Sequence, residues 1–225
     1  MKSNIIASSS SGNAILLENG ILLDCGVSYN KIKTYLKDIK AIFISHLWLH
    51  SDHCKDSTIK KIAFEYPNIK FITNQVNTKH LVDLGVNKKN IFGLKLDTWY
   101  NIGICKIRLE YLIHDKPNCA LKINQNGYKI IYIVDTGSVD HINALNYNYA
   151  FIESNYLSDE ELDKKIEQDK LENRFSHYER VKKTHLSQLQ AINWLQKNNI
   201  NNYAFIHEHK EKEKGKENDN KKKEI

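Results

Sequence analysis

The sequence lacks the features that mark membrane, secreted and disulfide-rich proteins. No apolar run approaches the roughly 18 residues that a membrane-spanning helix needs. The opening MKSNIIASSSSGN has neither the apolar core nor the cleavage signal of a secretory peptide. The four cysteines form no CxxC pair, which argues against a disulfide framework and against a zinc site made of cysteine alone. These absences predict a soluble cytoplasmic protein that contacts no membrane.

The net positive charge is also small once the C-terminal segment 210–225 is left out. The net charge is +6, from 33 Lys and Arg against 27 Asp and Glu. Seven of these cations and five of these anions lie in 210–225, so 1–209 holds 26 cations and 22 anions. So mild a bias is compatible with an anionic substrate but does not require a long nucleic acid. We predict one domain over 1–209 and a disordered tail over 210–225, because the tail has almost no apolar surface to bury.

What the sequence does contain is a series of short, apolar, β-branched runs of strand length. Asn-Gly dipeptides separate two neighbouring pairs of runs and predict hairpins there. Helical patterns alternate with the later runs, which is typical of an α/β protein with mixed sheets. The expected strands are 4–7, 14–18, 21–24, 41–45, 70–73, 106–113, 119–123, 129–134, 149–153 and 203–207. The expected helices are 28–38, 56–66, 76–84, 157–172 and 187–198.

Histidine or carboxylate side chains follow several of these strands. They are Asp24, His46, His114, Asp135 and His207. Because strand ends converge on one rim of a sheet, we expect these side chains to lie close together. HSDH at 50–53 adds three more candidate ligands. Imidazole and carboxylate bind Zn, Mn or Fe, and roughly seven such groups exceed the needs of one tetrahedral ion. The pattern therefore predicts two metals that share a bridging carboxylate.

The order of these motifs resembles that of metallo-β-lactamase-fold hydrolases. SSSSGN resembles the Ser-rich opening of one branch, ILLDCG its strand-turn motif and HSDH the end of the HxHxDH signature. IHD resembles the third-motif histidine and IVDTG the bridging aspartate. ESNY and THLS are similar to late motifs of a small cytoplasmic branch, which includes YycJ-type exonucleases and phage anti-Pycsar enzymes that cut cyclic mononucleotides. The resemblance implies an α/β fold, an αββα sandwich of two mixed sheets with flanking helices.

The resemblance also implies two divalent metal ions per chain, with Zn expected and Mn or Fe as alternatives. The implied ligands are His46, His50 and His114 for the first ion, Asp52, His53 and His207 for the second, and Asp135 as the bridge. Asp52 and Asp135 are expected to be catalytic as well. Nothing in this arrangement needs an organic cofactor.

The first histidine departs from the family pattern, because it lies four residues before His50 instead of two. Trp48 occupies the usual position. A bulge that loops out two residues would keep His46 at the site. Alternatively, His46 is lost from the site, or the protein is an inactive relative. We favour the bulge, because His46 directly follows a strand and bulges near active sites re-aim side chains. Trp48 would then border the site and contact a nucleobase, and ordinary core packing explains it equally well.

Further residues are expected to act beside the ligands. Asp24 is interpreted as a residue that orients a ligand histidine or ties the turn after its strand. In the branch that the chain resembles, a histidine in the HLS context faces the metals, so His185 is expected to contact a phosphate or protonate a leaving alkoxide. Ser11 and Asn13 lie in a turn that suits phosphate or base contacts, or that simply needs small residues. Asn155, in ESNY, is expected to border the pocket.

The leading substrate hypothesis is a small phosphodiester, namely a cyclic mononucleotide. The chain has no Gly/Pro-rich insertion like the tRNA-binding arm of ribonuclease Z-like enzymes, and its body charge is modest. A phage-borne copy would then antagonise cyclic-nucleotide defence signalling. The resemblance also implies a homodimer.

Other functions stay open at the level of sequence. The runner-up is a YycJ-like DNA exonuclease with a phosphate track along a basic cluster, which is more simply a solvated helix face. That cluster is Arg174, Arg180, Lys182 and Lys183. A thioesterase or lactonase comes third, followed by a non-catalytic binding protein.

Overall fold

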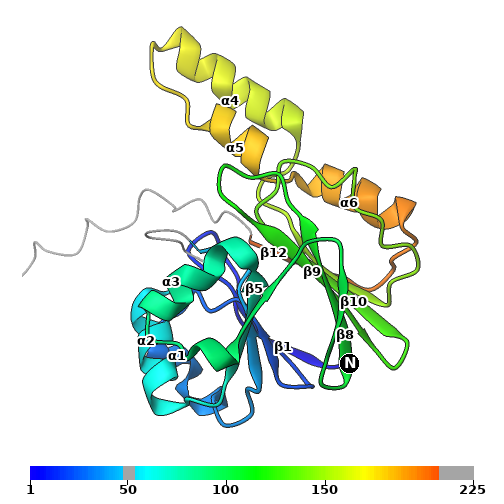
Figure 1. Ribbon diagram of the computed structural model, residues 1–225. Helices are drawn as coiled ribbons and strands as arrows, with labels where there is room; N and C mark the ends of the chain where they lie inside the picture. Colours follow the sequence, from blue (N-terminus) through cyan, green and yellow to red (C-terminus); the bar gives the residue numbers. More distant parts are fainter. Residues whose placement is uncertain (48–53, 208–225) are drawn as a thin grey trace, which may run out of the picture.

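The computed structural model describes residues 1–47 and 54–207, which form two six-stranded sheets packed face to face (Figure 1). The strands of the first sheet are β1 (Ser3–Ala7), β2 (Ala14–Leu17), β3 (Ile21–Leu23), β4 (Ala41–Phe43), β5 (Lys70–Asn74) and β6 (Ile91–Leu94). Those of the second are β7 (Trp99–Ile102), β8 (Cys105–Tyr111), β9 (Cys119–Gln125), β10 (Tyr128–Ile133), β11 (Tyr149–Glu153) and β12 (Tyr203–Ile206).

Both sheets are mixed. In the first, ordered β1-β2-β3-β4-β5-β6, the antiparallel pairs β1–β2–β3 are followed by parallel pairing from β3 to β6. In the second, ordered β12-β11-β10-β9-β8-β7, β10 to β12 are parallel and β7 to β10 are antiparallel. The carboxyl ends of parallel strands meet at one edge of each sheet, which is where ligand sites form in α/β proteins.

Helices flank the sandwich (Figure 1). The first sheet packs against α1 (Tyr29–Ile32), α2 (Asp56–Glu65) and α3 (Thr78–Asp83), with short 3-10 turns η1 (Lys33–Tyr35), η2 (Gln75–Asn77) and η3 (Lys88–Asn90). The second packs against α6 (Gln188–Lys197). α4 (Asp159–Leu171) and α5 (Tyr178–Thr184) form a hairpin that projects from one end of the sandwich (Figure 1). The αββα architecture predicted from the motifs is confirmed.

The interior between the sheets is apolar. Phe43 on β4 and Tyr132 on β10 meet edge to face, with ring centroids 6.1 Å apart, and Leu109, Leu121 and Phe151 are buried around them. Burying one such side chain contributes about 1.5–3 kcal/mol. A second apolar cluster lies between the first sheet and its helices, and a third lies between the second sheet and α6. The sheets are thereby fixed to one another, and so are the residues at their shared rim.

Most of the expected elements are present, and both Asn-Gly turns connect antiparallel pairs. At the second turn, Asn126 and Gly127 have φ of +53° and +86°, as a type I′ hairpin requires. Four elements were not predicted: η3, β6, β7 and α5. β7 is an edge strand whose Trp99 is 44% exposed, so no alternation of apolar residues marks it. The segment predicted as one helix over 28–38 is divided into α1 and η1.

Among the described residues, no helix is long and apolar enough to cross a lipid bilayer. The predicted tail over 210–225 lies outside the described residues.

Candidate metal centre and active site

Three residues at strand ends adopt a left-handed backbone conformation. Asp24 after β3, Asp135 after β10 and His207 after β12 have φ of +56°, +52° and +60°. This region costs a non-glycine residue roughly 1–2 kcal/mol, so it persists only where other contacts impose it. For Asp135 one such contact is the Asn118 amide, which donates to the carbonyl oxygens of Val134 and Asp135 at 2.8 and 2.7 Å. Strain of this kind concentrates at functional sites.

Asp135 lies at the centre of the rim and is buried. Its Oδ1 is 3.0 Å from Nε2 of His207 and 3.4 Å from Nδ1 of His185. Its Oδ2 is 3.5 Å from Nε2 of His46. Two ligands of one tetrahedral zinc ion are separated by about 3.3 Å, given bonds of about 2.0–2.1 Å. The spacing of Asp135 to His207 and to His46 therefore fits pairs of metal ligands, with a different oxygen facing each histidine.

His46 reaches this cluster from the opposite sheet. It is 4% exposed, and its ring centroid lies 5.5 Å from that of His114. Ser45 Oγ lies 3.3 Å from His46 Nδ1, and the Ser45 hydroxyl and N–H donate to the Asp24 carboxylate at 2.9 and 2.8 Å. Tyr132 OH donates to the same carboxylate at 2.6 Å. Asp24 thus links Ser45, the residue before His46, to Tyr132 of the second sheet, and its role in orienting a ligand histidine stays a prediction.

His114 follows β8 and faces the cluster from the second sheet. Its Nδ1 accepts from the Lys116 N–H at 3.3 Å and lies 3.0 Å from Asp115. Burial lowers the pKa of His114, outweighing Asp135 and Asp115, which raise it. The imidazole is therefore kept neutral, the form that binds a metal. Asp115 in turn accepts from Arg180 Nε and Nη2 at 2.8 and 2.6 Å, which ties α5 to this loop.

His185 is held against Glu153, a fully buried carboxylate at the end of β11. The distance from His185 Nδ1 to Glu153 Oε1 is 2.6 Å. The other oxygen, Oε2, accepts from the N–H groups of Thr136 and Leu186 at 3.1 and 3.4 Å. Burial lowers the pKa of His185, but Glu153 and Asp135 outweigh it and raise that pKa to about 10. The two carboxylates thereby favour the protonated form of His185, whose positive charge offsets theirs.

The donor set fits a divalent metal. Atoms of Asp135, Glu153, His185 and His207 all lie within 4.8 Å of one another. Imidazole nitrogen and carboxylate oxygen are ligands of Zn, Mn and Fe. His185 and Glu153 are 2.6 Å apart, and both Glu153 oxygens already have hydrogen-bond partners. These two residues are therefore better suited to bind each other than to bind a metal ion. His207 and Asp135 are the better-placed ligands.

A family model described as a beta-lactamase superfamily domain matches residues 19–207, most of the chain. The chain belongs to this superfamily.

Solved structures of the same fold cover nearly the whole of the superfamily domain. YhfI, a metallo-beta-lactamase fold protein from Bacillus subtilis, has a TM-score of 0.71 and 16% identity over 93% of this chain and 86% of that chain. Human tRNase Z, short form, has a TM-score of 0.69 and 15% identity, with 93% of each chain covered. Zn(2+)-bound PqqB from Methylobacterium extorquens has a TM-score of 0.67 and 10% identity, over 93% and 89%. A search of curated proteins found no sequence match.

These likenesses establish the superfamily fold, and the YycJ and anti-Pycsar branch stays a prediction. Of the residues that the motifs indicated, the structure brings together His46, His114, Asp135, His185 and His207. The candidates Trp48, His50, Asp52 and His53 lie outside the described residues.

The turn residues and Asn155 surround His207. Asn13 is fully buried, and its Nδ2 lies 3.5 Å from His207 Nδ1. The His207 N–H donates to Ser8 Oγ at 2.9 Å, and Asn155 Nδ2 donates to the His207 carbonyl at 3.5 Å. Ser11 is exposed at the turn, where its Oγ lies 2.8 Å from Ser9 Oγ. Asn13 therefore contacts the candidate ligand His207, whereas Ser11 faces solvent.

Glu153 is the site residue that the motifs did not single out. The signal was available, because YAFIE at 149–153 is an apolar strand that ends in a carboxylate, the same pattern that identified Asp135. Gly137 was missed as well. A Cβ at Gly137 would lie 2.0 Å from the Lys183 carbonyl oxygen, so only glycine lets this loop approach the end of α5, two residues before His185.

Proposed function

We propose that this protein is a metal-dependent phosphodiesterase that hydrolyses a small phosphodiester, with a cyclic mononucleotide as the leading candidate. The observation that carries the proposal is the His185–Glu153 pair, 2.6 Å apart and in direct reach of Asp135. A protonated imidazole beside the metal ligands is what a departing alkoxide needs, since an alkoxide must gain a proton as its bond to phosphorus breaks.

The metals are proposed to be two divalent ions, with Zn expected and Mn or Fe as alternatives. Support comes from Asp135, whose two oxygens face His207 and His46 separately, as suits a carboxylate shared by two ions. His114 is placed to complete the His46 side. The ions would supply Lewis acidity and lower the pKa of a water nucleophile. By resemblance, His50, Asp52 and His53 complete the ligand set, with Asp52 also catalytic.

The roles of the chain's own groups follow from their contacts. Hydrolysis joins a water oxygen to phosphorus and breaks the bond from phosphorus to a ribose oxygen. His185 donates the proton that this oxygen takes up, and Glu153 holds the ring by Nδ1, so that Nε2 is the nitrogen available to substrate. Asn13 orients His207 through Nδ1, which directs Nε2 toward Asp135.

A DNA exonuclease is less well supported, because the proposed phosphate track is largely neutralised. Arg174 lies 2.9 Å from Glu172, Arg180 2.6 Å from Asp115 and Lys182 2.6 Å from Asp163. A DNA backbone would have to compete with these carboxylates, or be repelled by them. The fold that this chain shares with tRNase Z keeps a nucleic-acid substrate as an alternative to test.

The test is a substrate panel with and without chelator. Full-length protein loaded with Zn or Mn is incubated with four 3′,5′-cyclic mononucleotides, labelled single-stranded DNA and a chromogenic thioester. Chelator-sensitive hydrolysis of a cyclic nucleotide is the expected result. Cleavage of DNA alone would favour the exonuclease, and cleavage of the thioester alone would refute a phosphodiesterase. Light scattering on the same sample tests the expected homodimer.

A further inference from the structure

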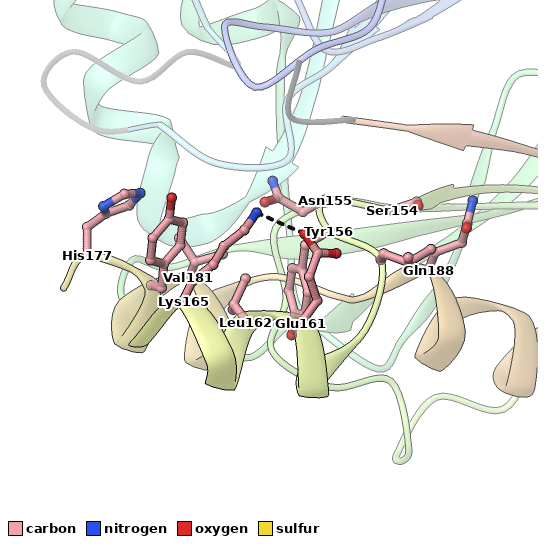
Figure 2. A pocket seen from close by; sticks show the side chains of 11 residues that line it. Ser154, Asn155, Tyr156, Glu161, Leu162, Lys165, His177, Val181 and Gln188 are labelled. Atoms are coloured by element: carbon pink, nitrogen blue, oxygen red, sulfur yellow. Dashed lines mark ion pairs between the residues drawn. The ribbon is translucent and has the colours of Figure 1, made fainter. Parts of the chain in front are cut away.

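A pocket of about 380 Å³ lies between the α4–α5 hairpin and the rim that carries the metal cluster (Figure 2). Its wall on the rim side is the segment after β11 together with Gln188 at the start of α6. Its other wall is the hairpin, with Lys165 of α4 and His177 and Tyr178 at the start of α5. Figure 2 shows the side chains of Asn155, Lys165 and His177 directed toward the same side of the hairpin. The pocket is thus built from three separate parts of the chain.

The pocket adjoins the metal cluster through two of its wall residues. Asn155 Nδ2 donates to the His207 carbonyl at 3.5 Å, and the Tyr156 hydroxyl oxygen lies 3.5 Å from the His185 carbonyl oxygen. Asn155 N–H also donates to the Leu186 carbonyl at 2.9 Å, which closes this wall against the segment that follows His185. The wall of the pocket is therefore continuous with the segments that carry His185 and His207.

The charges in the pocket argue against a second phosphate. Lys165 Nζ lies 2.8 Å from Glu161 Oε1, so the positive charge in the wall is balanced by a carboxylate in the same wall (Figure 2). Tyr156 OH donates to Asp159 at 2.9 Å, which places a further carboxylate next to this wall. An anionic group would meet repulsion here, whereas an uncharged group would not.

The remaining lining suits a flat, uncharged ring with polar edges. Tyr178 and His177 have ring centroids 4.1 Å apart, and Lys165 Nζ lies 5.6 Å from the Tyr178 ring centroid. His177 and Lys165 thus lie against the Tyr178 ring, and a base would stack on this ring by displacing one of them, whatever the identity of the base. The amides of Asn155 and Gln188 offer donors and acceptors to the edges of such a ring.

We propose that this pocket binds the base of a nucleotide substrate, with Tyr178 as the stacking platform and Gln188 at the base edge. The inference rests on the proposed phosphodiesterase activity. It adds that recognition of the base in this pocket determines which phosphodiesters are substrates. The pocket makes a base-bearing phosphodiester a better substrate than one of equal reactivity without a base.

The experiment compares a cyclic mononucleotide with the 3′,5′-cyclic phosphate of 1,2-dideoxyribose, which has the same reacting group but no base or other aromatic ring. Tyr178→Ala should raise KM for the cyclic nucleotide about tenfold, the usual order for loss of one base–aromatic stack. Its kcat/KM for the cyclic phosphate of 1,2-dideoxyribose should stay within about twofold of wild type, because a substrate without an aromatic ring makes no use of the pocket. Tyr178→Phe keeps the ring and should behave as wild type. Gln188→Leu, on the rim side of the pocket, should alter the preference among the four bases.

Matched controls separate a lost contact from a damaged fold. Phe64→Ala removes an aromatic ring on α2 that is 86% exposed and not part of the pocket, and should leave both substrates unaffected. Thermal unfolding of each variant shows whether the hairpin change destabilises the domain. If Tyr178→Ala fails to fold, Gln188→Leu alone decides.

The outcomes distinguish the two proposals. If wild type cleaves both substrates and the pocket variants change neither KM nor base preference, the base pocket is wrong and the phosphodiesterase stands. If wild type cleaves neither, the phosphodiesterase is wrong. Calorimetric titration with the four nucleoside 5′-monophosphates then decides the pocket. Binding that Tyr178→Ala weakens about tenfold supports it, on the same stacking estimate. No binding, or equal binding by the variant, overturns it.

Discussion

The close approach of Gly137 to the end of α5 gives a sharp test of how His185 is positioned. In a Gly137→Ala variant, the new Cβ would lie 2.0 Å from the carbonyl oxygen and 2.7 Å from the carbonyl carbon of Lys183. Unbonded heavy atoms settle at roughly 3.5 Å, so the two segments must separate by about 1 Å or more. Because both partners are backbone, a change of rotamer cannot relieve the overlap.

This separation would displace His185, the proposed proton donor. Gly137 is two residues after Asp135, and Lys183 is two residues before His185, whose Nδ1 lies 3.4 Å from Asp135 and 2.6 Å from Glu153. A misplacement of about 1 Å can cost about 100-fold in rate. Overpacking of this kind costs about 1–3 kcal/mol in stability. That corresponds to a Tm lowered by roughly 2–12 °C in a domain of this size.

The assay is the initial rate of phosphodiester hydrolysis, with thermal unfolding measured on the same samples. Lys183→Ala is the matched control, because it removes the side chain but leaves the carbonyl group that Gly137 meets, and it should retain the wild-type rate. We expect kcat to fall about 100-fold in Gly137→Ala while the protein still folds cooperatively. A variant with a wild-type rate and Tm would refute the reasoning, and so would an equal loss in Lys183→Ala.

Four other results are expected. Asp135→Ala should abolish turnover and lower the metal content measured by mass spectrometry, and unchanged turnover would refute a bridging role. Asn13→Ala should weaken metal retention about 10- to 100-fold in chelator competition while the fold is kept, since the contact that orients His207 is lost. Glu153→Gln removes the charge that helps raise the pKa of His185, so the alkaline limb of the kcat profile should move to lower pH, and a fixed limb would contradict the pairing. In chelator-treated protein, protonated His185 stabilises the fold below its ordinary pKa of 6.5, and this contribution is lost as pH rises toward about 10. Its Tm should therefore fall more steeply between pH 7 and 10 than that of His185→Gln.

Local pattern was sufficient for much of the fold. The runs of β-branched residues predicted β10 and β11, and Asn-Gly at 126–127 predicted the hairpin between β9 and β10, because these signals act between neighbours in the chain. The edge strand β7 and the short helix α5 escaped prediction, because neither has a continuous apolar face. They form where the rest of the structure offers them a partner.

The types of residue at the rim were predictable from the sequence, because His114, Asp135 and His207 each follow a strand and strand ends converge. The spacing of the first histidine left His46 undecided, and only the tertiary structure places its Nε2 3.5 Å from Asp135.

The sequence by itself determined most of the secondary structure and the chemical types gathered at the rim, because these depend on periodicity, turns and residue identity, whereas the two-sheet architecture followed from the resemblance of its motifs to a known family. The tertiary structure alone decided that Glu153 holds His185, that Gly137 must lack a side chain and that Asn118 supports Asp135. These contacts join residues that are 17 to 46 positions apart in the chain, and no local pattern encodes a distance between such residues. Packing of the two sheets and the α4–α5 hairpin sets those distances, and with them the chemistry that the rim can perform.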